Sequence, residues 1–180
     1  NVTQFSLNDM IHDVIANIQP MIAAKNNKLI VRCPADLGMV STDQTKLRQA
    51  ALNLMSNAAK FTEDGSITLS AQLRRSQAGD WIEIQVRDTG IGIAPEQLGR
   101  LFQNFGQATL GTSSKYGGTG LGLALSQKLC ALMGGGISVT SEIGLGSCFT
   151  IRVLARMTEQ TTAHDDIADA PAIPALAAAI

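Results

Sequence analysis

The chain has 180 residues, of which 45% are hydrophobic and 16% are charged, and its net charge is −1 at neutral pH. This length supports one domain with a real core, and the balanced charge argues against nucleic acid or an anionic membrane as a partner. No apolar run approaches the length of a membrane span, and Asn1 opens directly on domain sequence without a signal-peptide pattern. We therefore expect a cytoplasmic fragment of a longer protein, which could itself be membrane-anchored.

The three cysteines, Cys33, Cys130 and Cys148, are odd in number and far apart. This spacing favours buried free thiols over a zinc site or a disulfide framework.

The first predicted helix covers residues 7–25, where apolar side chains recur at helical spacing; they are Leu7, Ile11, Val14, Ile15, Ile18 and Ile22. Ser6 or Asn8 is placed to cap it, and Pro20 predicts a kink or a break. Short strands are expected at 28–33 and 38–41.

A second helix is predicted for residues 43–60, capped by Thr42 or Asp43. Its inward side chains are Leu47, Ala51, Leu54, Met55 and Ala58. Period-two alternation then predicts antiparallel strands at 67–74 and 81–87.

Pro95 suits the first turn of a short helix over 95–101. The stretch 104–119 is rich in Gly, Ser and Thr, and a loop of that length is usually functional. A third main helix is predicted for 121–133, followed by a hairpin of two strands, 137–142 and 147–154.

Three main helices and about six strands that do not strictly alternate predict an α/β two-layer sandwich, with the helices on one face of a mixed sheet. We expect this domain to cover residues 1–156. Residues 157–180 are rich in Ala and Pro and read as a flexible linker, suited to lead to a further domain.

Asn53 and Asn57 stand four residues apart on the second helix, so their side chains share one face, with Lys60 nearby. Amide oxygens can coordinate Mg²⁺, and an ammonium can balance phosphate charge. On spacing alone, a solvated helix face with an ordinary surface lysine explains this pattern better.

Asp88 ends a strand and begins a loop that contains Gly90, Gly92 and Ile93. A carboxylate there can accept a hydrogen bond from an exocyclic amine, and the glycines let the backbone approach a flat ring. The alternative is an aspartate that caps a turn before Pro95.

A glycine-rich stretch opens the third helix; it comprises Gly118, Thr119, Gly120, Leu121 and Gly122. Its N–H groups and the positive helix end would face anionic phosphates. The stretch follows neither the P-loop nor the Rossmann pattern. The alternative is a tight entry turn in which glycine permits close packing.

Taken in order, with Phe102 and Phe105 between the last two, these three motifs resemble the ATP-binding catalytic domain of sensor histidine kinases, in the gyrase, Hsp90, histidine kinase and MutL (GHKL) ATPase superfamily. The resemblance covers about residues 1–156 and implies the Bergerat fold, with ATP and Mg²⁺ as cofactors. It implies that Asn57 binds the metal and that Lys60 contacts phosphate. Asn53 would line the same site, and Phe61 would lie against the base or ribose.

The same resemblance implies that Asp88 binds the adenine amino group and selects ATP over GTP, with Gly90, Gly92 and Ile93 beside the base. Residues 106–119 would form an ATP lid, mobile without nucleotide, in which Lys115 contacts phosphate together with residues 118–122. Ser114 stands where such lids often carry a second basic residue, which puts strong phosphate clamping in doubt. Thr150 would reach the adenine through water.

The function implied is transfer of the γ-phosphoryl group to a histidine on a separate dimerisation domain, in two-component signalling with a response-regulator receiver. Hydrolysing relatives carry a general-base Glu where this chain has Asn53, and an imidazole acceptor needs less activation than water. His12 and His164, the only histidines, lack the acceptor pattern, so the acceptor is expected outside this chain.

The Ala- and Pro-rich tail would suit a linker to a receiver domain, so we expect a hybrid kinase as the parent, and we expect the isolated fragment to be monomeric. The alternatives are a GHKL-type ATPase, a catalytically silent nucleotide-binding module, or a serine or protein kinase of the same fold.

Overall fold

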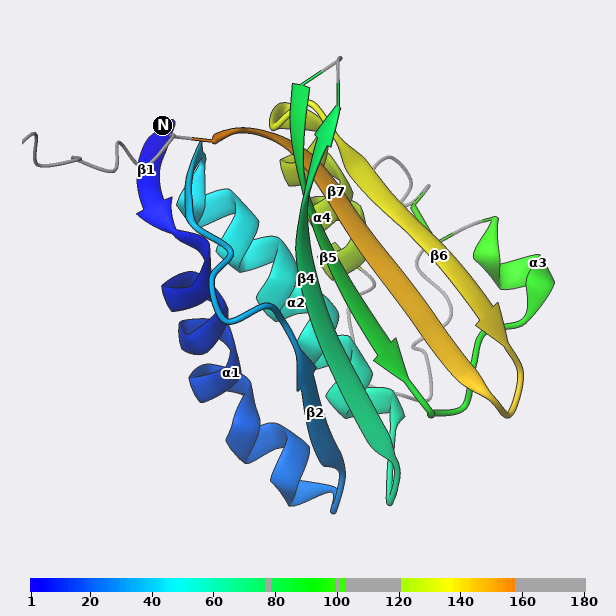
Figure 1. Ribbon diagram of the computed structural model, residues 1–180. Coiled ribbons are helices and arrows are strands. Elements are labelled where there is room, and N and C mark those ends of the chain that lie inside the picture. Colours follow the sequence, from blue (N-terminus) through cyan, green and yellow to red (C-terminus); the bar gives the residue numbers. More distant parts are fainter. Residues whose placement is uncertain (77–78, 100, 103–120, 158–180) are drawn as a thin grey trace, which may run out of the picture.

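The computed structural model describes residues 1–76, 79–99, 101–102 and 121–157. These residues form two layers, a seven-stranded mixed sheet with three longer helices on one face (Figure 1). The predicted α/β sandwich is therefore confirmed. Most of the expected lid and residues 158–180 of the expected linker lie outside the described part of the chain.

Helix α1 (Leu7–Ala24) begins at its N-cap Ser6, whose hydroxyl accepts a hydrogen bond from the Asp9 N–H at 3.2 Å. The helix does not end at Pro20 but continues to Ala24. Pro20 is exposed, while Ile18 and Ile22 on either side of it are buried in the core. Packing of this apolar face thus outweighs the hydrogen bond that proline removes.

Helix α2 (Gln44–Phe61) has Asp43 as its N-cap, and the Asp43 carboxylate accepts a hydrogen bond from the Lys46 N–H at 3.1 Å. This helix packs against both α1 and α4 (Leu121–Leu132). Its buried face is broad, and it consists of Leu47, Ala50, Ala51, Leu54, Met55, Ala58 and Ala59. Helix α2 is therefore the centre of the helical layer.

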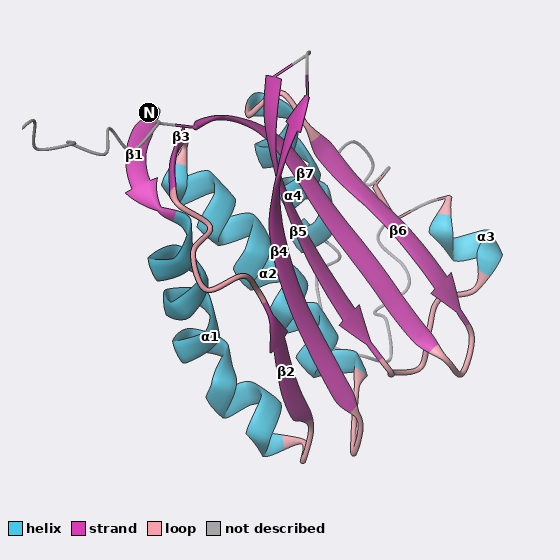
Figure 2. Cartoon of the chain, viewed as in Figure 1, coloured by secondary structure: helices cyan, strands magenta, loops and turns pink. Residues whose placement is uncertain are grey.

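The sheet runs in the order β1-β3-β7-β5-β4-β2, with β6 on the other side of β7 (Figure 2). The strands are β1 (Thr3–Ser6), β2 (Lys28–Arg32), β3 (Met39–Thr42), β4 (Ser66–Ser76), β5 (Gly79–Asp88), β6 (Gly136–Glu142) and β7 (Gly146–Met157). Only β2 and β4 pair in parallel among these described strands. Strand β1 was not predicted, because four residues with one buried side chain, Phe5, carry too little pattern.

Strand β5 carries the alternation that positions the site. Its residues Ile82, Ile84 and Val86 are buried toward the helices, and Asp88 continues the same alternation at the strand's end. Because successive side chains point to opposite faces, the carboxylate lies on the helix-covered side of the sheet. The other face is polar, with the Arg152 guanidinium 4.4 Å from the ring centroid of Trp81.

Helix α3 (Pro95–Leu98) is shorter than the predicted 95–101, with Gly99 as its C-cap. Among the described residues, no helix is long and apolar enough to cross a membrane.

Candidate functional site

A cavity of about 240 Å³ lies where α2, the loop after β5, α3, α4 and β7 meet. Most of its walls are apolar, and Asp88, Asn57, Gln97 and Ser147 are the polar residues among them. The full lining is Asn57, Ala58, Phe61, Asp88, Ile91, Gly92, Ile93, Gln97, Leu101, Leu123, Ser147 and Phe149. An apolar pocket with a few convergent polar groups is typical of a small-molecule site.

Asp88 is the charged group of this cavity, and its side chain is nearly buried, with 7% of the residue exposed. Its Oδ1 accepts hydrogen bonds from the N–H groups of Gly90 at 2.9 Å and Ser147 at 3.3 Å. Burial raises the pKa of this carboxyl above its usual range, and the two hydrogen bonds oppose that rise. Within the described residues Oδ2 accepts no hydrogen bond, so it is available to an amine in the cavity.

Glycine is required at two positions of the loop after Asp88. Gly92 has a φ of +72°, and a Cβ there would collide with the backbone carbonyl of Glu142. A Cβ at Gly90 would collide with the carbonyl of Phe61, which also accepts a hydrogen bond from the Ile91 N–H at 3.2 Å. The loop is thus pressed between the end of α2 and the β6–β7 hairpin, which fixes one wall of the cavity.

The site residues predicted on α2 do not all lie in the same cavity. Asn57 and Phe61 line the cavity with Asp88. Lys60 does not line it, but its Nζ lies 5.3 Å from the ring centroid of Phe61. Asn53 lies in a separate hollow of about 300 Å³ between α2 and α4.

The glycine-rich stretch is described only in part. Gly122 lies in the first turn of α4, against the Asn53 side chain. Leu121 begins the helix, and Lys115, Gly118, Thr119 and Gly120 lie outside the described residues. Of the two phenylalanines, Phe102 packs against the core, while Phe105 is not described.

Strand β7 supplies site residues that sequence reasoning missed. Ser147 pairs with Asp88 across the sheet, and Phe149 lies two residues further on the same side. The expectation that Thr150 reaches the adenine is wrong, because alternation turns Thr150 to the opposite face, where Gln85 donates to its hydroxyl at 3.4 Å. Alternation along β7 shows in the sequence that Ser147 and Phe149 share one face of the strand. Placing them beside Asp88 also requires the pairing register of β7 against β5.

Ser141 and Thr62 were missed as well. The Ser141 hydroxyl accepts a hydrogen bond from the Ile93 N–H at 2.8 Å and so holds the loop after Asp88. Thr62 follows α2 and is fully buried, and its hydroxyl has no hydrogen-bond partner among the described residues.

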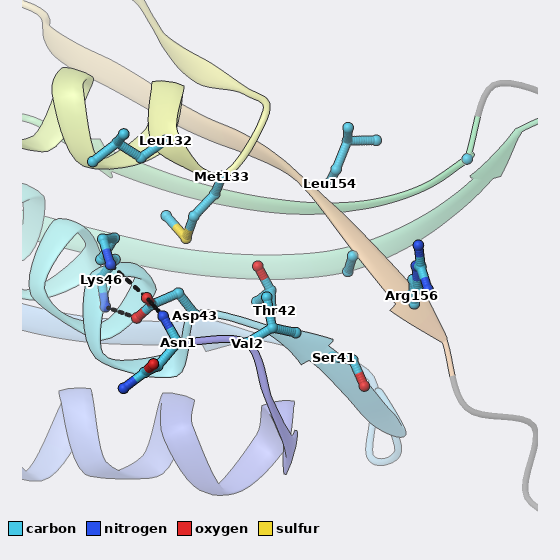
Figure 3. A pocket seen from close by; sticks show the side chains of 12 residues that line it. Asn1, Val2, Ser41, Thr42, Asp43, Lys46, Leu132, Met133, Leu154 and Arg156 are labelled. Carbon is cyan, nitrogen blue, oxygen red and sulfur yellow. Dashed lines mark hydrogen bonds and ion pairs between the residues drawn. The ribbon is translucent and has the colours of Figure 1, made fainter.

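A larger cavity, of about 1020 Å³, lies at the opposite end of strand β5, beside Asp43 and Lys46 (Figure 3). Leu132, Met133 and Leu154 give it apolar walls, and two of its charged side chains pair with each other: the Asp43 carboxylate lies 2.5 Å from Lys46 Nζ. We assign the smaller cavity as the site, because there polar groups from four elements, α2, β5, α3 and β7, converge on one largely apolar space.

The comparisons agree with this geometry. Residues 42–157 match the family model described as histidine kinase-, DNA gyrase B- and HSP90-like ATPase. The chain is 40% identical over 151 residues to the sensor histidine kinase RcsC of Escherichia coli, covering 83% of this chain and 16% of RcsC. It is 34% identical over 169 residues to the autoinducer 2 sensor kinase/phosphatase LuxQ of Vibrio cholerae, covering 93% of this chain and 20% of LuxQ. The chain thus spans about a fifth or less of these relatives.

Solved structures show the same fold. Full-length ShkA in complex with AMPPNP superposes with a TM-score of 0.73 at 30% identity, covering 88% of this chain and 32% of ShkA. The catalytic domain of histidine kinase ThkA, in a nucleotide-free form, gives a TM-score of 0.71 at 25% identity and covers 86% of this chain and 95% of that domain. The chain therefore belongs to the histidine kinase-, DNA gyrase B- and HSP90-like ATPase family, and within it to the catalytic domains of sensor histidine kinases.

Proposed function

We propose that this domain binds Mg·ATP in the cavity at Asp88 and transfers the γ-phosphoryl group to a histidine on a separate dimerisation domain. The observation that carries the proposal is the buried Asp88 carboxylate in the wall of a largely apolar cavity, where one of its oxygens has no donor among the residues that the structure describes. ShkA, one of the similar structures, holds the ATP analogue AMPPNP.

Asp88 would distinguish adenine from guanine. Its free oxygen can accept a hydrogen bond from the exocyclic amine of adenine, while guanine has a carbonyl at that position and would oppose acceptor to acceptor. Gly92 and Ile93 would border the ring, with Phe61 against the base or ribose. A buried acceptor left without a donor costs about 1–3 kcal/mol, so we expect GTP to bind roughly 10- to 100-fold more weakly than ATP.

Asn57 and Lys60 would act at the phosphate end. No cluster of three or more His, Cys, Asp or Glu side chains able to hold a metal occurs in the described residues, so a cation here needs amide, phosphate and water oxygens. The Asn57 amide fits Mg²⁺, which keeps several waters and binds through substrate phosphates. Bound Mg²⁺ would neutralise charge on the phosphates. Lys60, Lys115 and the backbone of residues 118–122 would add positive charge around the transferred group.

Transfer to histidine is favoured over hydrolysis because α2 offers no general base. Asn53 is an amide that cannot take a proton, and Glu63 is exposed beyond the end of α2. Water needs such a base more than an imidazole does. The partners would be the histidine-bearing dimerisation domain of the same kinase and a response-regulator receiver.

We further propose that the parent is a hybrid kinase and that residues 157–180 link this domain to the next one. The relative from Dictyostelium discoideum named hybrid signal transduction histidine kinase B, 37% identical over 160 residues, supports this assignment. The matched region covers 88% of this chain but only 8% of that relative.

Titration calorimetry with ATP, ADP and GTP, with and without Mg²⁺, tests the nucleotide site. We expect adenine-selective binding that Asp88→Asn weakens by about 10- to 100-fold, because the amide can turn its NH₂ toward the adenine amine. The matched control is Glu63→Gln, the same loss of charge at an exposed position outside the cavity. Equal affinity of the wild type and Asp88→Asn for ATP would contradict the proposed role of Asp88.

A further inference from the structure

The Asn53 side chain touches two successive turns of α4. Its Nδ2 donates a hydrogen bond to the Ser126 hydroxyl at 2.8 Å. One turn earlier in α4, a Cβ on Gly122 would lie 2.6 Å from Asn53 Oδ1 and 2.7 Å from Nδ2, so only glycine leaves room for the amide. Because Gly122 and Ser126 are four residues apart, they share one face of α4, and the amide fits between them.

This contact joins the two helices that flank the phosphate end of the proposed site. Asn57 lies one turn beyond Asn53 on α2 and lines the cavity at Asp88, while Gly122, the last residue of the glycine-rich stretch, lies in the first turn of α4. Ser126 is 1% exposed, so its hydroxyl is not open to solvent. Among the residues that the structure describes, Asn53 Oδ1 accepts no hydrogen bond, and the bond to Ser126 is the one that orients this amide.

We propose that Ser126 is a positioning residue for the phosphate end of the nucleotide site. Through its hydrogen bond to Asn53, it holds the first turn of α4 at a fixed distance from Asn57 on α2. This inference rests on the proposed binding of Mg·ATP and deepens it. Asp88 and the loop after it are held by β7, by Ser141 and by the end of α2, so the carboxylate that would bind the base is positioned without Ser126, and α4 adds to that cavity only the apolar Leu123.

Comparing the affinity for adenosine, which has only the base and ribose, with the affinity for Mg·ATP therefore tests the role of Ser126. Ser126→Thr and Ser126→Val add the same bulk and differ only in whether a hydroxyl is present. We expect Ser126→Val to bind Mg·ATP about tenfold more weakly than Ser126→Thr, which is the effect of one ordinary hydrogen bond. The affinity for adenosine, which lacks phosphates, should differ by less than about twofold between them.

A double-mutant cycle of Asn53→Ala and Ser126→Ala tests whether Ser126 affects Mg·ATP affinity through Asn53, with substitutions that add no bulk. Because Ser126 acts through Asn53, the double variant should bind Mg·ATP no more weakly than Asn53→Ala alone. Ser56→Ala is the control: Ser56 lines the same hollow, but its hydroxyl contacts Met21 of α1 at 3.6 Å. Thermal unfolding checks that each variant is folded.

Equal Mg·ATP affinity of the Thr and Val variants, or equal losses for adenosine and Mg·ATP, would overturn the role of Ser126, as would additive losses in the cycle. If the Thr and Val variants do not fold, the cycle decides. A wild-type domain that binds neither adenosine nor Mg·ATP would instead refute the proposed function itself, and this inference with it.

Discussion

The two ends of the proposed site are built differently. At the base end, Asp88 is fixed by the backbone: N–H groups of its own loop and of β7 bind one oxygen, and glycines press the loop against α2 and the β6–β7 hairpin. At the phosphate end, the described contacts join side chains on two helices, Asn53 and Ser126. Backbone contacts thus position the base end, whereas a side-chain hydrogen bond between two packed helices positions the described part of the phosphate end.

Gly92→Ala should produce the largest effect at the base end. The new Cβ would collide with the Glu142 carbonyl, at a φ of +72° that disfavours any side chain. We expect a loss of about 1–3 kcal/mol in unfolding free energy and no detectable binding of adenosine. Urea denaturation and calorimetry measure the two.

Gly99→Ala is its matched control, because Gly99 has ordinary helical φ and nothing lies within 4 Å of the added Cβ. It should leave both quantities nearly unchanged. If both variants behaved alike, the close approach at Gly92 would have no bearing on the site.

The pH dependence of adenosine binding sharpens the role of Asp88. Burial raises the pKa of this carboxyl, and only the ionised form can accept the adenine amine with full strength. As pH falls through the raised pKa, the group protonates and affinity declines, at a higher pH than for an ordinary aspartate with a pKa of about 3.9. Adenosine is the ligand of choice because phosphates titrate near pH 6.

Asp88→Asn removes the titrating group, so its weaker binding should not change over the same pH range. Burial of the charged carboxylate costs stability, so protonation of Asp88 should raise the unfolding free energy as pH falls. A wild-type affinity that is flat down to about pH 4 would contradict the assignment.

Asp43, at the N-terminal end of α2, should change stability with pH in the opposite direction from Asp88. The Lys46 side chain binds its carboxylate and, with a hydrogen bond from the Lys46 N–H, holds its pKa well below the usual range. Its stabilisation is therefore present above about pH 4 and is lost as pH falls. Asp43→Ala should cost about 1 kcal/mol at neutral pH through loss of the N-cap, with no change in nucleotide affinity.

Asp13→Ala, at an exposed position of α1, is the control for Asp43→Ala and should change stability little. Urea denaturation at two pH values measures the effect. A stability difference between the wild type and Asp43→Ala that grew as pH fell would show that the sign is wrong.

Thr62→Val should give the smallest effect, a gain of about 1 kcal/mol in unfolding free energy. The valine has the same shape and removes a buried hydroxyl that has no partner among the described residues. Thr140→Val, the same change at an exposed strand position, should be nearly neutral. A clear loss of stability in Thr62→Val would show that the hydroxyl is satisfied, for instance by an ordered water.

The sequence predicted the longer helices and most strands because their apolar periodicity is strong. Of the kink or break predicted at Pro20, the break does not occur, because the packing of Ile18 and Ile22 outweighs the hydrogen bond that proline removes. The candidate site was predicted as separate motifs. Asn57, Phe61 and Asp88 meet in one cavity, whereas Asn53 is displaced toward Ser126. Ser126 and Ser147 were not foreseen, because helix packing and strand register bring together residues that are distant in sequence.

Phosphoryl transfer is the most direct test of the central proposal. The domain would be incubated with Mg²⁺ and ATP labelled at the γ-phosphate, together with the separately produced dimerisation domain of the same kinase. We predict label on that partner, stable in alkali and lost in acid, as expected for a phosphate bound to a histidine nitrogen. Release of labelled phosphate without labelled protein, or label on the partner that is stable in acid, would contradict transfer to histidine.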